Sequence, residues 1–270
     1  MKKMLNYLFL AGILSWSLGP FIWQWMTSFK NPSLVSQLPP LLPPSLEIEN
    51  YVSVLGNRQF LQVIVNSLTV SLGATGVSLV AGSLGAFGIS RLVRCGKNFI
   101  LFSLLVIFMI PQVAVVTPFY KFLGYCNLRD SLYGLILVYS VFTVPLVVWI
   151  MHQVYDEIPD SLYQAARVDG CGNWRIFLKI YLPLGSSGMI SACLLSVMFC
   201  WNEFLFALTY TSTYASRTIP VGISLFTGQH EFPWGEISAA TSIVTLPILL
   251  IVFLAQKQLV RGLVGSGIKG

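Results

Sequence analysis

Six long apolar stretches run along the chain, and shorter segments that hold most of the charged residues separate them. Each stretch has at least the roughly 20 residues that an α-helix needs to cross the hydrocarbon core of a membrane. The stretches lack the alternation of polar and apolar residues that marks the ten-residue strands of a membrane barrel. The pattern predicts an all-α integral membrane protein, a single transmembrane domain over residues 1–270, with spans at about 4–28, 61–90, 98–120, 131–154, 184–208 and 237–257.

Composition supports a membrane class, because hydrophobic residues make up 55% of the chain and charged residues only 10%. Positive charges then indicate the orientation, since cytoplasmic loops are enriched in lysine and arginine. With a cytoplasmic N-terminus, 11 of the 16 Lys and Arg residues fall on the inner side, so we expect both termini in the cytoplasm. The net charge of +6 reflects this asymmetry and contact with membrane lipid. It does not indicate nucleic-acid binding, because the chain has no module of aromatic and basic residues.

A polar cytoplasmic loop, residues 156–183, separates the fourth and fifth spans. Pro159 suits the first turn of a helix, and the acids around it suit the positive end of the helix dipole. Gly170 and Gly172 suit the end of the same helix. The loop carries five charges within fourteen residues and therefore must lie in water: Asp156, Glu157, Asp160, Arg167 and Asp169.

A narrow face of small side chains on this predicted helix would let another surface approach closely. Leu162, Ala165 and Ala166 have the i, i+3, i+4 spacing that places them together. A second amphipathic piece follows, with Trp174 on its apolar side, and Pro183 ends it before the next span.

The loop resembles that of the inner-membrane permease subunits of ATP-binding-cassette (ABC) importers. That family has Glu-Ala-Ala, then Gly four residues after the second Ala, then Ile-x-Leu-Pro; here the match is Gln164-Ala165-Ala166, Gly170 and Ile180-x-Leu182-Pro183. Gln164 replaces the acidic residue, so the resemblance implies the docking shape but no salt bridge through that carboxylate. It implies an ATPase-docking site formed by Asp160, Tyr163, Gln164, Ala165, Ala166, Asp169, Gly170, Trp174 and, in the tail, Lys269.

Two further segments resemble the carbohydrate branch of this family. Trp201-Asn202-Glu203-Phe204 is similar to a stretch of the fifth helix along the translocation path of sugar-type permeases. The tail, residues 258–270, ends in Gly-Ser-Gly-Ile-Lys-Gly and resembles the tail of the maltose-type second permease, which reaches into the ATPase pair.

The resemblance implies a set of partners. These are two ATPase subunits that hold ATP and Mg, a second homologous permease in a heterodimer, and an external solute-binding protein. The chain itself is then expected to bind no cofactor, to lie in a bacterial inner membrane, and to work by alternating access.

Glu203 is the one acid well inside an apolar region, and an ionisable group there is by default a hypothesis for a functional site. Asn202 and Glu203 could bind solute hydroxyls, hold a gate, or satisfy each other near the outer interface beside Trp201. Gln112, next to Pro111, adds polarity at membrane depth. The candidate residues of the solute path are therefore Gln112, Trp201, Asn202 and Glu203.

The second span carries a small residue at every fourth position, which predicts close packing against another helix of this chain or of a partner. These residues are Ala74, Ser78, Gly82, Ala86 and Ser90. The external segment 30–58 has four prolines between residues 38 and 44. Such a density excludes a helix there and predicts an extended strap, either a lid or a stiff linker.

The chain has no Gly-x4-Gly-Lys-Ser/Thr phosphate-binding loop and no catalytic or metal-ligating set of residues. It is therefore expected to be no enzyme and to take its energy from a partner. Two other interpretations stay open, an ion- or proton-coupled carrier that titrates Glu203 and an ABC permease for a polyamine or inorganic anion. Within the sugar type, the solute is left open among a maltose-like sugar, trehalose, a glucosylated polyol and glycerol phosphate.

Overall fold

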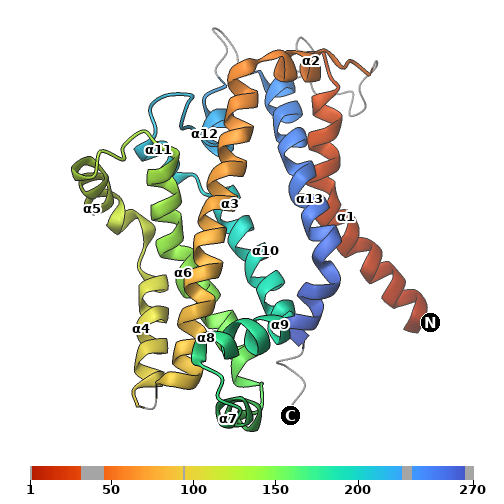
Figure 1. The fold of residues 1–270 in the computed structure, drawn as a ribbon. Helices are drawn as coiled ribbons and strands as arrows, with labels where there is room; N and C mark the ends of the chain where they lie inside the picture. The colour runs from red at the N-terminus through yellow and green to blue at the C-terminus, as the bar shows by residue number, and fades with distance from the viewer. Residues whose placement is uncertain (1, 32–45, 94, 227–232, 265–270) are drawn as a thin grey trace.

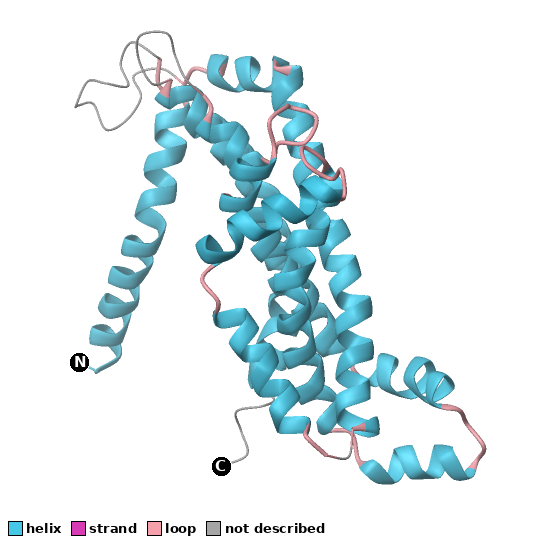
Figure 2. Cartoon of the chain, turned by 90° about the vertical axis from the view of Figure 1, so that its left-hand side faces the viewer, coloured by secondary structure: helices cyan, strands magenta, loops and turns pink. Residues whose placement is uncertain are grey.

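A computed structural model describes residues 2–31, 46–93, 95–226 and 233–264, and all regular structure in these residues is helical (Figure 1, Figure 2). Four helices are long and apolar enough to cross a membrane, and the number rises to six if each of two bent helix pairs counts as one span. The prediction of an all-helical membrane protein is confirmed at this level. The four helices that could each cross a membrane by themselves are Met4–Ser28, Arg58–Leu92, Leu132–Asp156 and Trp234–Phe253.

The helices follow one another in the order shown in Figure 1. Two five-residue π-helical turns, η2 and η3, continue α3 and α8. The bounds are α1 Lys2–Ser28, α2 Glu49–Gly56, α3 Arg58–Phe87, η2 Gly88–Leu92, α4 Lys97–Met109, α5 Gln112–Tyr125, α6 Leu132–Asp156, α7 Asp160–Val168, α8 Asn173–Ile176, η3 Phe177–Tyr181, α9 Leu182–Leu184, α10 Ser186–Asn202, α11 Leu205–Tyr210, α12 Ile219–Ser224 and α13 Trp234–Val264.

The stripe of small residues on α3 packs directly against α6, as the sequence predicted. Ala74, Ser78 and Gly82 are all buried, and the hydroxyls of Ser78 and Thr143 lie 2.5 Å apart across the interface. A Cβ at Gly82 would lie only 2.6 Å from Cγ1 of Val147. Small side chains thus let the two backbones approach closely, and α10 packs against both helices to complete the core.

The predicted third span is not one straight helix. The chain bends by 90° between α4 and α5, because Pro111 has no N–H to continue the helix and holds Ile110 in an extended conformation. The 13 residues of α4 reach only about 20 Å, which is short of the roughly 30 Å hydrocarbon core.

The predicted fifth span is also divided. The chain bends by 77° where the segment 173–184 meets α10. A second break follows at Glu203 and Phe204, where the backbone leaves helical geometry before α11 begins. The region that the sequence predicts as one span over 184–208 therefore holds α10, an extended break and α11.

Two predicted segments fall partly outside the described residues. The proline run of the external segment lies there, while Glu49–Gly56 of the same segment forms α2. Asn50 of α2 donates from Nδ2 to the carbonyl oxygens of Ser28 and Lys30, at 3.0 and 2.9 Å, and so ties α2 to the end of α1. At the C-terminus, α13 continues to Val264, seven residues into the predicted tail, and Lys269 lies outside the described part.

We expect Gly82→Ala to lower the melting temperature of the detergent-solubilised chain. Overpacking against Val147 costs about 1–3 kcal/mol, which exceeds the gain of up to about 1 kcal/mol from replacing a helical glycine. The matched control is Gly76→Ala in the same helix, where a Cβ would meet nothing within 4 Å. Equal melting temperatures for the two variants would contradict the close packing of α3 and α6.

Candidate functional site

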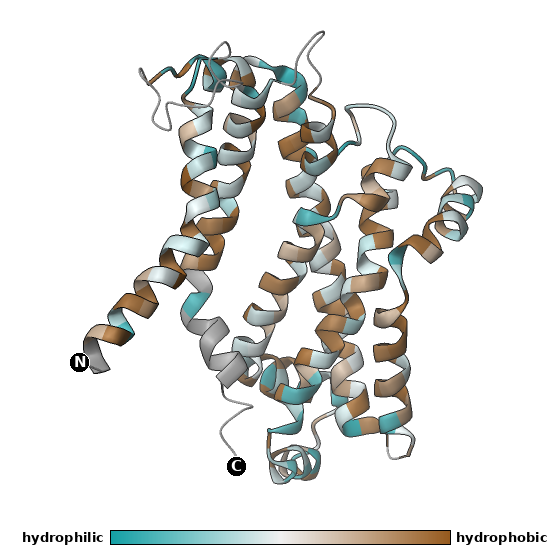
Figure 3. Cartoon of the chain, turned by 180° about the vertical axis from the view of Figure 1, so that it is seen from behind, coloured by the Kyte–Doolittle hydropathy of each residue, from teal (hydrophilic) through white to brown (hydrophobic). Residues whose placement is uncertain are grey.

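The polar loop 156–183, for which docking is predicted, forms one end of the molecule. In Figure 1, α7 lies at the bottom, below α8, while α2 and α12 lie at the opposite end. Figure 3 shows the same helix as a largely hydrophilic coil beneath brown, hydrophobic transmembrane helices. The chain thus separates a polar end that carries α7 from a second end that carries α2, α12 and the segment between α11 and α12.

The helix α7 forms and ends for local reasons. Pro159 precedes it and Asp160 lies in its first turn, where a carboxylate favours the positive end of the helix dipole. At the other end, Gly170 N–H donates to the carbonyl of Arg167 at 3.1 Å and Cys171 N–H donates to that of Ala166 at 2.9 Å. These two bonds form a Schellman motif, which requires the positive φ of +77° that Gly170 adopts.

Two sides of α7 have different environments. Its inner side packs on the chain itself, since Ala166 is buried with Ile158 and Ile176 in one core cluster and Tyr163 is half-buried against it. The outer side exposes apolar side chains on a polar loop, with Leu162 39% and Val168 87% exposed. These apolar side chains are accessible for contact with a partner.

Most of the predicted docking residues are exposed, some on α7 and others in the turn after it or on α8. Tyr163 hydroxyl donates to Oδ1 of Asn173 at 3.1 Å, and so fixes the turn after α7. Ala166 faces inward and is not accessible to a partner. Val168 is an exposed residue that the motif did not single out. The exposed members of the predicted set are Asp160, Gln164, Ala165, Asp169, Gly170 and Trp174.

Glu203 caps the helix that follows it. Its carboxylate accepts the backbone N–H of Phe206 at 2.9 Å and of Ala207 at 3.2 Å, and the residue is 5% exposed. The first amides of α11 therefore have hydrogen-bond partners although the helix is interrupted just before them. Asn202 does not pair with Glu203, because its Nδ2 donates to the carbonyl of Met198 at 2.8 Å.

The other two candidate path residues lie in different surroundings. Trp201 is buried in a cluster with Val54, Phe60 and Val63. Gln112 is half-buried in the first turn of α5, just beyond the bend at Pro111. The four candidates therefore do not form one cluster, and Glu203 owes its burial to a backbone contact that sequence alone does not reveal.

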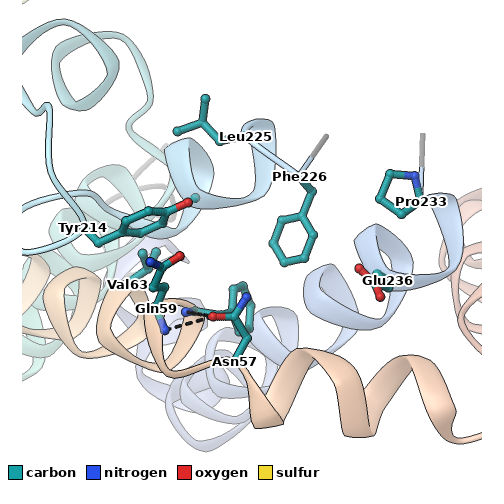
Figure 4. Close-up of a pocket in the computed structure, with 10 residues that line it drawn as sticks. Asn57, Gln59, Val63, Tyr214, Leu225, Phe226, Pro233 and Glu236 are labelled. Carbon is teal, nitrogen blue, oxygen red and sulfur yellow. Dashed lines mark hydrogen bonds between the residues drawn. The ribbon is translucent and has the colours of Figure 1, made fainter. Parts of the chain in front are cut away.

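A pocket of about 420 Å³ opens at the end of the molecule opposite α7 (Figure 4). Its volume is within the range of small-molecule sites. Figure 4 shows Tyr214 and Gln59 at one side, Glu236 at the other and Phe226 between them, with Asn57 below. The remaining lining residues are Phe60, Val63, Gly222, Leu225 and Pro233.

Asp130, in the turn before α6, clamps the segment that carries Tyr214. Its Oδ1 accepts the backbone N–H groups of Ser212 and Thr213 at 2.7 and 3.1 Å, and the hydroxyls of Thr213 and Ser216 also donate to the carboxylate. Burial raises the pKa of Asp130, but these hydrogen bonds favour the charged form and together lower the pKa from 3.8 to about 2. The carboxylate therefore stays ionised and holds the wall of the pocket.

Comparison with known proteins agrees with the architecture. Residues 78–265 match the family of binding-protein-dependent transport system inner membrane components. The chain is 33% identical to the trehalose transport system permease protein SugB of Mycobacterium tuberculosis, over 96% of this chain and 94% of that protein. It is 35% identical to the trehalose/maltose transport system permease protein MalG of Thermococcus litoralis, over 94% and 92%. Its fold is similar to that of a chain from a bacterial ABC transporter involved in the import of the acidic polysaccharide alginate, with a TM-score of 0.81, 19% identity and coverage of 94% and 95%.

The helical fold and these matches define a membrane permease, and the chain belongs to the binding-protein-dependent permease family of ABC importers. Within that family it is similar to permease subunits of trehalose and trehalose/maltose transport systems. It is a non-catalytic membrane subunit, as the sequence resemblance implied, and not an ion-coupled carrier.

We expect Asp130→Asn to lower the free energy of unfolding at pH 7 by on the order of 1–2 kcal/mol, because the amide accepts fewer hydrogen bonds than the carboxylate. The melting temperature should fall accordingly. The folded pKa of about 2 lies below the unfolded value of 3.8. The ionised group therefore stabilises the fold above about pH 4, and this contribution is lost as the pH falls toward about 2. The difference in melting temperature between the wild-type chain and Asp130→Asn should therefore decrease as the pH falls from about 4 toward about 2.

Melting curves of the wild-type chain and the variant from pH 7 downward would measure this. Glu157→Gln, an exposed acid at the end of α6, is the control. A difference that stays constant down to about pH 2 would show that the Asp130 hydrogen bonds do not depend on its charge.

Proposed function

We propose that α7 is the docking helix through which this permease receives the movement of an ATPase subunit. The observation that carries the proposal is the outer side of α7, where exposed apolar side chains lie on a short polar helix that the chain holds from within. A partner that covers Leu162, Ala165 and Val168 would remove this apolar area from water. The family match supports the same assignment, since this permease has no nucleotide-binding motif of its own.

The α7 end then faces the cytoplasm. In Figure 1, α1 begins in the lower half of the view, and α13 runs down from the top into the same half. Both helix ends are thus in the half of the molecule that carries α7, which supports cytoplasmic termini. The excess of lysine and arginine on the inner segments supports the same orientation. We place the chain as a multi-pass protein of a bacterial inner membrane, with ATP and Mg on the ATPase subunits.

A second permease and an external binding protein complete the proposed assembly. The described transmembrane helices leave many large apolar side chains exposed, among them Trp16, Phe102 and Leu250. Lipid covers part of this area, and a homologous permease in a heterodimer would cover another part. The family description, binding-protein-dependent transport, supports an external solute-binding protein at the opposite end, near α2 and α12.

Alternating access is the mechanism that these features support. Closure of the ATPase pair would draw the docking helices together and rotate the permease halves. The bend between α4 and α5 and the break at Glu203 add irregular backbone at membrane depth, which belongs beside neighbouring helices or a water-filled path. The chain would thus transmit force and line half of the path.

The pocket near α2 and α12 is a candidate entrance for the solute. Aromatic rings of Tyr214 and Phe226 together with amide and carboxylate groups suit a neutral, hydroxyl-rich molecule such as a sugar. Glu236, held by the Ser53 hydroxyl at 2.8 Å, disfavours an anionic solute. Trehalose and maltose, which occur in the names of two relatives, are the first solutes to test.

The docking proposal predicts that Gly170→Val strongly reduces ATP-driven uptake without affecting membrane insertion. A β-branched residue at φ +77° is strained, so the Schellman motif and the turn after α7 should be lost. Gly172→Val is the control, since Gly172 has an extended backbone and open space around it.

Tagged chain would be isolated with its partners, and ATPase recovery, ATP hydrolysis and uptake in proteoliposomes would be measured. Normal recovery and uptake for Gly170→Val would refute docking through α7. A wild-type chain that purifies alone would refute the proposed assembly.

The solute proposal predicts that Gln59→Ala raises the half-saturating concentration for trehalose or maltose uptake several-fold. Leu61→Ala, which lies outside the pocket lining, should not.

By contrast, Glu203→Gln should lower the melting temperature, since an NH2 donor replaces one of the two oxygens that accept the backbone N–H groups. A buried donor left without a partner costs about 1–3 kcal/mol. If Glu203→Gln instead changes solute affinity at unchanged melting temperature, Glu203 acts in the path rather than as a cap.

A further inference from the structure

The last turn of α3 lies against the docking loop. Phe87 packs on two aromatic residues of η3, the segment that leads from the loop back toward the membrane. The ring centroids are 5.5 Å from Phe177 and 4.9 Å from Tyr181. Four residues further on, in η2, Arg91 extends from the same end of α3 into the loop.

Arg91 joins α3 to both sides of the connection between α6 and α7. Its Nη2 donates to the carbonyl oxygens of Tyr155 at 2.9 Å and Ile158 at 2.5 Å, and its Nη1 donates to Oδ1 of Asp160 at 2.9 Å. These acceptors are in the last turn of α6, in the connecting residues and in the first turn of α7. The guanidinium also lies 5.4 Å from the ring of Tyr181.

The electrostatics favour a cation at this point. Carbonyl groups at the C-terminal end of α6 carry the negative end of the helix dipole, and Asp160 adds a full negative charge. The planar guanidinium donates from two separate nitrogens held in a fixed fork, whereas a lysine ammonium carries its three donors on one flexible, strongly hydrated nitrogen. The side chain of Arg91 is 9% exposed, so water has little access to replace these bonds.

A neighbouring ion pair provides a contrast. Lys97, at the start of α4, lies 2.7 Å from Oδ1 of Asp156 at the end of α6, and the two side chains are 29% and 49% exposed. Exposed pairs of this kind contribute little, typically below about 1 kcal/mol. The side chain of Asp160 is itself 66% exposed, so the ion pair alone does not set Arg91 apart. Arg91 differs because its own side chain is shielded from water and bonds to two backbone carbonyls as well as to a carboxylate.

We propose that Arg91 is a positioning residue that makes α3 move as one body with the docking helix α7. The proposal rests on the docking function of α7. Arg91 and the residues that it bonds to form a joint between α3 and α7. Since α3 packs against α6 and α10 in the core, a rigid joint passes a displacement of α7 directly to the transmembrane helices. Without the bonds of Arg91, α7 can move with the ATPase while α3, α6 and α10 keep their positions, and ATP is hydrolysed without transport.

The first test compares Arg91→Lys with Lys97→Gln in the complete transporter reconstituted in proteoliposomes. Arg91→Lys keeps the positive charge but loses the rigid fork of two donor nitrogens. We expect it to reduce the amount of trehalose or maltose moved per ATP hydrolysed at least five-fold, while ATPase subunits still copurify. Lys97→Gln should leave this ratio within two-fold of wild type. An unchanged ratio for Arg91→Lys, or an equal loss for Lys97→Gln, would overturn the proposal.

A second measurement needs no variant. Hydrogen exchange of the wild-type transporter, with and without ATP, would follow the amides of Val93, Ile158 and Leu162, which are hydrogen-bonded around the joint. A joint that moves as one body predicts equal protection in both states. Faster exchange of these amides in one state, with unchanged exchange in the middle of α3, would show that the joint opens and would refute the proposal.

Failure of the underlying docking proposal gives a different result. If α7 does not dock an ATPase, Gly170→Val leaves the recovery of ATPase subunits and uptake unchanged. If only the joint is wrong, Gly170→Val still impairs both and Arg91→Lys does not alter the coupling ratio.

Discussion

Close contact between the backbones of α3 and α6 is the interaction on which the rest of this permease depends. Lipid chains are as apolar as leucine, so the hydrophobic effect gives these helices little reason to associate within the membrane. Small side chains at Ala74, Ser78 and Gly82 provide the close approach, and the contact between the Ser78 and Thr143 hydroxyls fixes the register. The core helix α10 and both ends of the molecule are arranged around this pair.

The interruptions of the helices follow from the same need to satisfy the backbone in lipid. At Glu203 the helix is interrupted, and the carboxylate accepts the N–H groups that the interruption would leave without a partner. At Pro111 no N–H exists to be satisfied, and the chain turns by 90° into α5. An acid at membrane depth therefore has a structural task here, whatever further part it takes along the path.

Much of the fold could be predicted from the sequence because the membrane imposes a simple rule, and long apolar runs become helices. The stripe on α3 was recognisable for a similar reason, since its spacing of four residues has one geometric meaning in a helix. The bend at Ile110 was less visible, because Pro111 lies in an unbroken apolar run and a proline can kink a helix without ending it.

The sites were predictable only where local sequence determines them. Gly170 ends α7 through bonds within its own turn, so its role followed from the motif. Arg91, counted only as a positive charge on the inner side, bonds to residues that are 64 to 69 positions away along the chain. Asp130 bonds across more than 80 positions to the segment that carries Tyr214. Contacts of this range depend on the packing of whole helices, which no periodicity in one chain specifies.

The division of α7 into an inner and an outer side also bears on how such transporters diversify. Residues such as Ala166 are committed to the permease's own core, so substitution there disturbs the fold. Residues such as Leu162 and Val168 contact water in the free subunit and can change with little effect on the permease itself. The proposed docking surface for an ATPase can therefore vary independently of the scaffold that carries it. A cell with several importers could in this way share one ATPase among many permeases, or keep each pair separate, by changes on a few outward positions of one nine-residue helix.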